Sequence, residues 1–321
     1  MDVLSTLIST AFLAAILRVA TPYVLASLGG VVAERAGIPN IALEGQMLIA
    51  ACTAVLVSGY SEKVWLGAFC GIAAGALLAV LLAFTYLELG ADPIIAGIGL
   101  NLLASGTTAF AVFTLLGDKG GTTGLHSGSL PTITIPILAS IPVLGPILSG
   151  QNTLTYLALL LVPAVSWMLY RSRFGFHLRS VGEMPDAAET VGIAARRVQY
   201  SALALSGALA GAGGVFLSMA AVSFFVREMT AGRGFIALAA VFLGGVRPWG
   251  AFFAALGFGL SEALAIQLGN LAVPTQLVTA IPYILTLVAL GIFAARRTRA
   301  QKRPRPSPGN PPLEPAQAGA S

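Results

Sequence analysis

Long apolar runs, each about the length of a membrane-spanning helix, alternate with short polar segments along most of the chain. A helix needs roughly 20 predominantly apolar residues to cross a bilayer. The runs that approach this length predict spans at 40–60, 64–87, 92–116, 153–170, 199–222, 232–246, 250–270 and 276–294. The run at 232–246 is so short that a partial, re-entrant crossing is an alternative there.

The first apolar run, residues 3–33, is interrupted by Arg18. Two arrangements fit it: residues 3–17 lie along the membrane interface while 20–33 crosses, or both parts cross as short helices. No basic residue precedes Arg18 and no small-residue cleavage signal follows, so the run does not resemble a removable signal peptide. We therefore expect an all-α, polytopic membrane protein with eight to ten spans.

Composition supports a membrane protein and excludes several other classes. Hydrophobic residues make up 56% of the 321 residues and charged residues only 10%, against about 25% charged in an ordinary soluble domain. Too few charges remain to cover the surface of a soluble enzyme. The two cysteines, Cys52 and Cys70, both lie in apolar runs, so a secreted disulfide scaffold is excluded as well.

The net charge of +5 arises from basic clusters at the ends of the apolar runs rather than from one soluble face. Lys and Arg beside membrane spans mark cytoplasmic segments, so we do not expect a nucleic-acid partner. Segments expected in the cytoplasm are 33–39, 88–92, 171–198, the turn at Arg247 and the tail. Segments expected outside are 61–63, 117–152 and 223–231.

These assignments divide the chain into a transmembrane domain, 1–295, and a tail, 296–321. The tail is basic and Pro-rich, which is typical of a disordered segment that contacts anionic membrane lipid. Proline spacing in the outer segment 117–152 excludes a further span and favours an extracytoplasmic cap.

Glycines are spaced for close helix packing. Gly67, Gly71 and Gly75 recur every fourth residue, and Gly207 and Gly211 have the same spacing. Lipid is as apolar as leucine, so helices in a membrane associate through close backbone contact on such faces. We expect these glycines to form helix–helix interfaces.

Recognisable catalytic chemistry is absent from the sequence. There is no P-loop, and no motif of a zinc peptidase, a redox dithiol or a serine hydrolase. We therefore predict no catalytic residue, no metal site and no cofactor bound by this chain; any ATP would bind a partner subunit.

Four polar residues within or beside the spans are candidates for a solute path, because polar groups are costly in a bilayer. Glu262 could line the path, remain protonated or pair with Arg233. Asn101 could bind a solute or join two helices by hydrogen bonds. Glu44 follows Asn40, which could cap a helix that begins after Pro39, and a carboxylate at such a helix start needs no other reason.

The cytoplasmic loop contains signals for a short helix over about 185–191. Pro185 suits the first turn, Asp186 and Glu189 favour the positive end of the helix dipole, and Gly192 can close it in a left-handed conformation. Ala187 and Ala188 would give this helix a small surface that a partner could approach closely. A plain connecting helix is the alternative.

The segment DAAETVG at 186–192 resembles the EAA loop of ABC importer permeases. Further matches follow in order along the chain: AERAGIPNIALEGQMLIA at 33–50, GIGLNLLASG at 97–106, VGEMPDAAETVGI at 181–193 and AGRGFIALAAVFLGG at 231–245. Together they resemble the branched-chain amino acid, ribose and simple-sugar permease family, with GRGFIALAA closest to its nucleoside-importing branch. One departure is Asp186, which stands where the loop usually has Glu.

This resemblance implies a permease in the cell membrane that works with a second permease chain, ABC ATPase subunits and an extracytoplasmic substrate-binding protein. The residues implied in ATPase coupling are Gly182, Glu183, Pro185, Asp186, Ala187, Ala188 and Gly192. The alternatives are an ABC permease for ribose or branched-chain amino acids, an ion-coupled transporter that uses Glu262, and a membrane scaffold or receptor without transport.

Overall fold

The computed structural model describes residues 10–118, 120–125, 127–134 and 144–269 of the chain. Its helices, in chain order, are α2 (Thr10–Arg35), α3 (Leu43–Ser61), α4 (Val64–Leu87), α5 (Pro93–Leu116), α7 (Leu144–Leu148), α8 (Thr153–Arg171), α9 (Arg173–Glu183), α10 (Pro185–Thr190), α11 (Ala195–Phe216), the π-helical segment η1 (Leu217–Ala221), α12 (Arg233–Leu243) and α13 (Pro248–Gly269). Two short strands, β1 (Thr132–Ile133) and β2 (Gln151–Asn152), pair antiparallel.

Seven of these helices are long and apolar enough to cross a membrane: α2, α3, α4, α5, α8, α11 continued by η1, and α13. Each corresponds to a predicted apolar run, which confirms an all-α, multi-pass membrane protein. The predicted span at 276–294 and the tail at 296–321 lie outside the described residues. Helix α12 has only 11 residues, so the segment 232–246 does contain a shorter helix than a full crossing requires.

The amino-terminal run forms one continuous helix, so both arrangements expected for it were wrong over the described part. α2 runs from Thr10 to Arg35 through Arg18 and Pro22. Arg18 is exposed and lies only about two turns from the helix start, so its long side chain can extend towards the membrane surface. The helix therefore continues without burying the charge.

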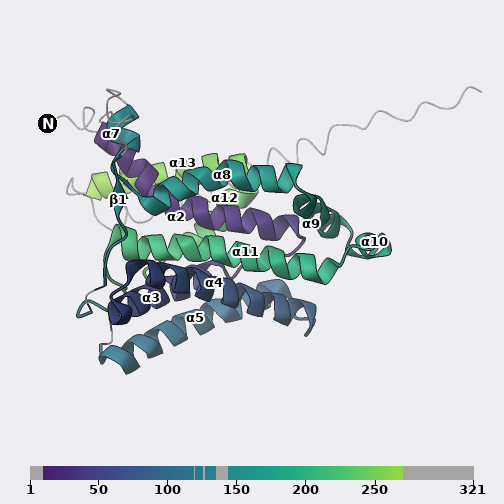
Figure 1. The fold of residues 1–321 in the computed structure, drawn as a ribbon, viewed down its shortest axis with the longest axis horizontal. Helices are drawn as coiled ribbons and strands as arrows, with labels where there is room; N and C mark the ends of the chain where they lie inside the picture. Colours follow the sequence, from purple (N-terminus) through teal and green to yellow (C-terminus); the bar gives the residue numbers. More distant parts are fainter. Residues whose placement is uncertain (1–9, 119, 126, 135–143, 270–321) are drawn as a thin grey trace, which may run out of the picture.

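The long helices run side by side, with α9 and α10 at one end of the bundle and α7 and β1 at the other (Figure 1). Loops that the charge pattern predicts to share one side of the membrane contact one another at the same end of the bundle. At the first end Arg196 pairs with Glu88, and Gly182 packs on Gly37. We call this the basic end of the bundle, because Arg35, Arg171, Arg179, Arg196 and Arg247 all belong to it.

At the opposite end, segments of the outer loop pack on the chain that follows α11. Leu130 donates its N–H to Met219, and Gly121 forms a β-bridge with Val226. Asn152 caps α8 by accepting the N–H of Leu154 at 3.0 Å. The loop 117–152 is thus fixed to the bundle over its described part, although its role as an extracytoplasmic cap stays a prediction.

Glycines allow the central helices to touch through their backbones, as their spacing predicts. A Cβ added at Gly75 would lie 2.8 Å from the carbonyl oxygen of Gly207, and one at Gly67 would lie 2.5 Å from that of Ala54. α4 therefore packs closely on α11 where Gly75 meets Gly207, and on α3 where Gly67 meets the backbone of Ala54. α11 is the most enclosed of the long helices described, and the largest hydrophobic cluster includes residues of both α2 and α11.

Candidate functional site

Helix α12 is too short to cross a bilayer, and its first turn packs against the start of α3. Its 11 residues span about 16 Å, whereas the apolar core of a bilayer is about 30 Å thick. Gly232 adopts a left-handed conformation with φ of 79° immediately before the helix. The N–H groups of the first turn therefore open towards the start of α3.

Glu44 on α3 accepts hydrogen bonds from two of these N–H groups. One carboxylate oxygen lies 2.8 Å from the nitrogen of Gly232, and the other lies 2.6 Å from that of Gly234. A Cβ on Gly234 would lie 2.4 Å from the backbone nitrogen of Glu44. Gly234 thus permits a close approach of α12 to α3, and the carboxylate of Glu44 satisfies N–H groups that have no partner within α12.

Glu44 does lie at a helix start, as predicted, but it also binds the start of a second helix. Glu44 lies in the first turn of α3 and also caps α12, which the sequence did not indicate. Asn40 does not cap α3, so that prediction was wrong: the helix begins at Leu43, and Asn40 hydrogen-bonds Gln46 and Ser206 instead. A buried amide here gains more from two side-chain partners than from one backbone N–H.

Arg233, the first residue of α12, forms a salt bridge with Glu262 on α13. The two side chains meet at 2.5 Å and are 23% and 15% exposed. The guanidinium also donates to the carbonyls of Met229 and Thr230. The hydroxyl of Tyr23 on α2 donates to the second oxygen of Glu262. Of the three alternatives for Glu262, the structure contains the ion pair.

Asn101 on α5 bridges two elements, as one of its two interpretations predicts. Its amide donates to the carbonyl of Ile41 at 3.0 Å and accepts the N–H of Gly45 at 2.8 Å. Gly45 directly follows Glu44. One turn further along α5, Ser105 donates to Glu228 in the segment that leads to α12.

Glu44 and Glu262 therefore both bind the start of α12, where Arg233 lies, and Asn101 joins the same region through Gly45, the residue after Glu44. We call Glu44, Asn101, Arg233 and Glu262 the polar cluster. Sequence reasoning missed Tyr23, Ser105 and Glu228, because each reaches the cluster from a different element. The only signal that could have found them is that a hydroxyl or carboxylate inside an apolar run needs a hydrogen-bond partner.

A second candidate site lies at the basic end, where the loop helix forms as predicted. α10 begins with Pro185 and ends at Thr190, and Gly192 has a φ of 86°. Ala188 is buried against Val181 and Ala195, whereas Ala187 is exposed. Gly182 in α9 touches the turn after α2, since a Cβ there would lie 2.1 Å from the carbonyl oxygen of Arg35.

An open groove runs between α9 and α10 at this position. It has a volume of about 340 Å³, and its lining combines apolar and polar side chains. Those lining residues are Phe176, Ser180, Glu183, Met184, Ala187, Ala188, Val191 and Ile193. Met184 and Val191 are among the most exposed apolar residues of this end, so the groove is a surface suited to a protein partner.

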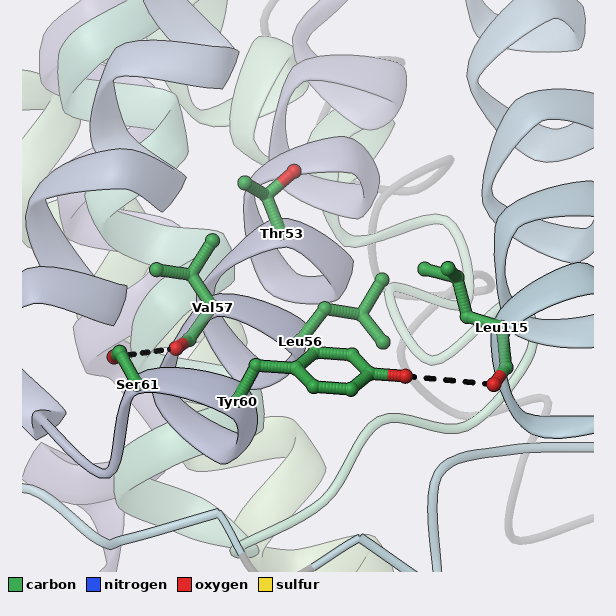
Figure 2. A pocket seen from close by; sticks show the side chains of 6 residues that line it. All are labelled: Thr53, Leu56, Val57, Tyr60, Ser61 and Leu115. Carbon is green, nitrogen blue, oxygen red and sulfur yellow. Dashed lines mark hydrogen bonds between the residues drawn. The ribbon is translucent and has the colours of Figure 1, made fainter.

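A separate cavity, of about 500 Å³, lies between the carboxyl-terminal ends of α3 and α5 (Figure 2). Leu56, Val57 and Leu115 surround it, and Tyr60 closes one side by donating its hydroxyl to the carbonyl of Leu115 (Figure 2). Its walls offer few polar groups. This cavity suits an apolar occupant and not a solute rich in hydroxyl groups.

Comparison with known proteins connects these features to one family. Residues 12–290 match the family described as branched-chain amino acid transport system / permease component. The guanosine ABC transporter permease protein NupQ of Bacillus subtilis is 38% identical over 290 residues, covering 86% of this chain and 90% of the relative. The nucleoside ABC transporter permease protein NupC of Lactococcus lactis is 35% identical over 308 residues, covering 92% and 95%.

A third relative differs in the solute it is named for. The putative glucose ABC transporter permease protein TsgC13 of Haloferax volcanii is 34% identical over 317 residues, covering 91% of this chain and 94% of the relative. Matches of this extent span the whole bundle, including the polar cluster and the loop helix.

Proposed function

This chain belongs to the family described as branched-chain amino acid transport system / permease component, and we propose that it forms the membrane path of an ATP-driven importer of nucleosides. The observation that carries the proposal is its similarity, over most of both chains, to permeases named for guanosine and for nucleosides. Transport rather than catalysis is the role of these relatives. The similarity to a putative glucose permease makes simple sugars the second candidate solute.

The charge of the polar cluster supports an uncharged solute. The N-terminus of a half-helix inside a membrane attracts anionic groups of a solute. Here Glu44 already occupies that end of α12, and Arg233 is engaged by Glu262. An anionic solute would meet a carboxylate where it needs a donor, whereas an uncharged nucleoside or sugar would meet no such repulsion.

We place the basic end in the cytoplasm by the positive-inside rule. A separate ATPase would then grip the groove beside α10 and move it when nucleotide binds. The residues proposed for this contact are Gly182, Glu183, Pro185, Asp186, Ala187, Ala188 and Gly192. Since Ala188 packs on α9 and α11, force applied to α10 would reach the long helix α11 directly, and rigid packing favours movement of helices as bodies.

Reconstitution of the complete importer tests this function. Proteoliposomes would contain this permease, its partner permease and the ATPase, with the binding protein added outside. Guanosine uptake should require hydrolysable ATP inside the vesicle and should exceed glucose uptake. Uptake that continues with a hydrolysis-deficient ATPase but collapses with the ion gradient would support ion coupling instead, and absence of any flux would support a scaffold.

Ala187→Trp tests the coupling surface. Ala187 is exposed and α10 retains its caps, so the variant should fold; the bulky ring should abolish most ATP-dependent uptake by blocking the groove. Ala73→Trp is the matched control, because Ala73 is also exposed but lies on α4 within the membrane. Full uptake by Ala187→Trp would contradict the proposed ATPase contact.

A further inference from the structure

A cavity at the basic end combines two arginines with aromatic side chains. It has a volume of about 740 Å³ and lies between the ends of α2 and α8 and the start of α13. Arg35, Tyr170, Arg247 and Trp249 contribute its polar and aromatic walls, and Gly244 and Gly250 its backbone walls. None of these residues belongs to the polar cluster or to the groove beside α10.

The two guanidiniums are available to an anion. Arg35 uses one N–H for the carbonyl of Val246 at 2.9 Å and another for the hydroxyl of Tyr170 at 3.4 Å. These bonds hold it beside Arg247 and leave three of its five N–H donors for a ligand. Within the described parts of the chain, neither arginine forms a salt bridge and no acidic side chain lines the cavity.

A third arginine and a helix N-terminus add to the positive potential in this cavity. The guanidinium of Arg179 lies over the ring of Tyr170, 5.4 Å from its centroid. Helix α13 begins at Pro248 and is 22 residues long, so the partial positive charge of its dipole adds to the cavity. A phosphate group would therefore gain both hydrogen bonds and a favourable field.

Among the described residues, exposed aromatic side chains surround the cavity. On the α8 side, Trp167 is 65% exposed and Tyr170 is 40% exposed; on the α13 side, Trp249 is 48% and Phe253 63% exposed. Trp and Tyr are enriched at the level of lipid headgroups. An anion that enters sideways would thus arrive with an acyl chain lying on these rings.

We propose that this cavity binds the phosphate headgroup of one anionic phospholipid from the inner leaflet. The phosphate lies between Arg35 and Arg247, and the acyl chains follow the exposed faces of α8 and α13. Basic pockets between helices on the cytoplasmic side are suited to such headgroups. Because Val246 and Arg247 form the turn between α12 and α13, a bound lipid would steady the connection behind the half-helix.

The test uses the full-length chain in detergent and native mass spectrometry. The probes are phosphatidylglycerol and phosphatidylcholine with identical acyl chains. Phosphatidylglycerol should bind in preference, and Arg247→Gln together with Arg35→Gln should weaken that binding by about fivefold for each arginine. The matched control, Arg196→Gln with Arg197→Gln, removes the same charge from the same end and should leave binding unchanged.

Arg247→Gln alone keeps the test decisive should loss of the Arg35 contacts prevent folding, because the Arg247 side chain is exposed. Equal binding of the two lipids, or equal loss in the control, overturns the proposal. If millimolar inorganic phosphate displaces the lipid and also raises the melting temperature of the permease, the cavity binds free phosphate instead. If Arg247→Gln no longer binds the partner ATPase but still binds the lipid as the wild type does, the cavity is a contact site for the ATPase instead.

Discussion

Breaking the ion pair between Arg233 and Glu262 should destabilise the protein more than removing both charges. At an effective dielectric constant of 20, two charges 4 Å apart attract by about 4 kcal/mol, and these side chains approach to 2.5 Å. Leaving one partner of a buried pair uncompensated costs about 3–5 kcal/mol. Since the two side chains keep 23% and 15% exposure, we expect the lower end, about 3 kcal/mol, for Glu262→Leu.

The assay is a double-mutant cycle on the purified permease, read as the apparent melting temperature in one fixed detergent. Arg233→Met and Glu262→Leu should each lower it clearly, and the double variant should recover most of the loss. The exposed pair Arg196 and Glu88 provides the control, since exposed pairs contribute about 0–1 kcal/mol. Single variants that melt like the wild type would refute the reasoning, because Glu262 would then carry no structural charge pair.

Uptake by the same double variant separates the two roles of the pair. A purely structural pair predicts that restored stability restores transport. A stable double variant without transport would mean that Arg233 or Glu262 contacts the solute.

Two other changes follow from the packing and capping described above. Gly75→Ala should lower the stability of the folded protein by about 1–3 kcal/mol, because its methyl group would lie 2.8 Å from a backbone oxygen. The control Gly106→Ala has no atom within 4 Å of the added methyl group and should be neutral or stabilise α5 by up to about 1 kcal/mol. Equal melting temperatures of the two variants would contradict the α4–α11 interface. Glu44→Ala should lower the stability of the folded protein by about 2 kcal/mol, because two N–H groups lose their hydrogen-bond acceptor. Glu44→Gln should lower it less, because the amide oxygen keeps one acceptor. Melting temperatures of the two variants make this comparison as well.

Features governed by neighbours in sequence were predictable. The apolar run at 92–116 matches α5, whose start is fixed locally: Asp92 accepts the N–H groups of Ile94 and Ile95, and Pro93 is the first residue of the helix. Pro185 and Gly192 bounded α10 to within a residue or so. The glycine spacing placed a close interface correctly because a helix repeats its faces every three to four residues.

Features that depend on distant partners were not predictable. Asn40 has the residue type of a cap, but Gln46 and Ser206 compete for its amide across the bundle. Glu44 caps a helix that begins 189 positions later, at Arg233. Polar residues in apolar runs marked where the polar cluster would form, but only the packing of α3, α5, α12 and α13 decided which of them meet.

The short helix α12 also constrains how the protein is made. Its first peptide groups are satisfied by Glu44, a residue synthesised long before them, and an unsatisfied peptide group in hydrocarbon costs several kcal/mol. The segment 222–247 is therefore a poor substrate for independent insertion by the translocon. It should leave the translocon together with α13, as a hairpin, and only after α2 and α3, against which α12 packs, have been inserted.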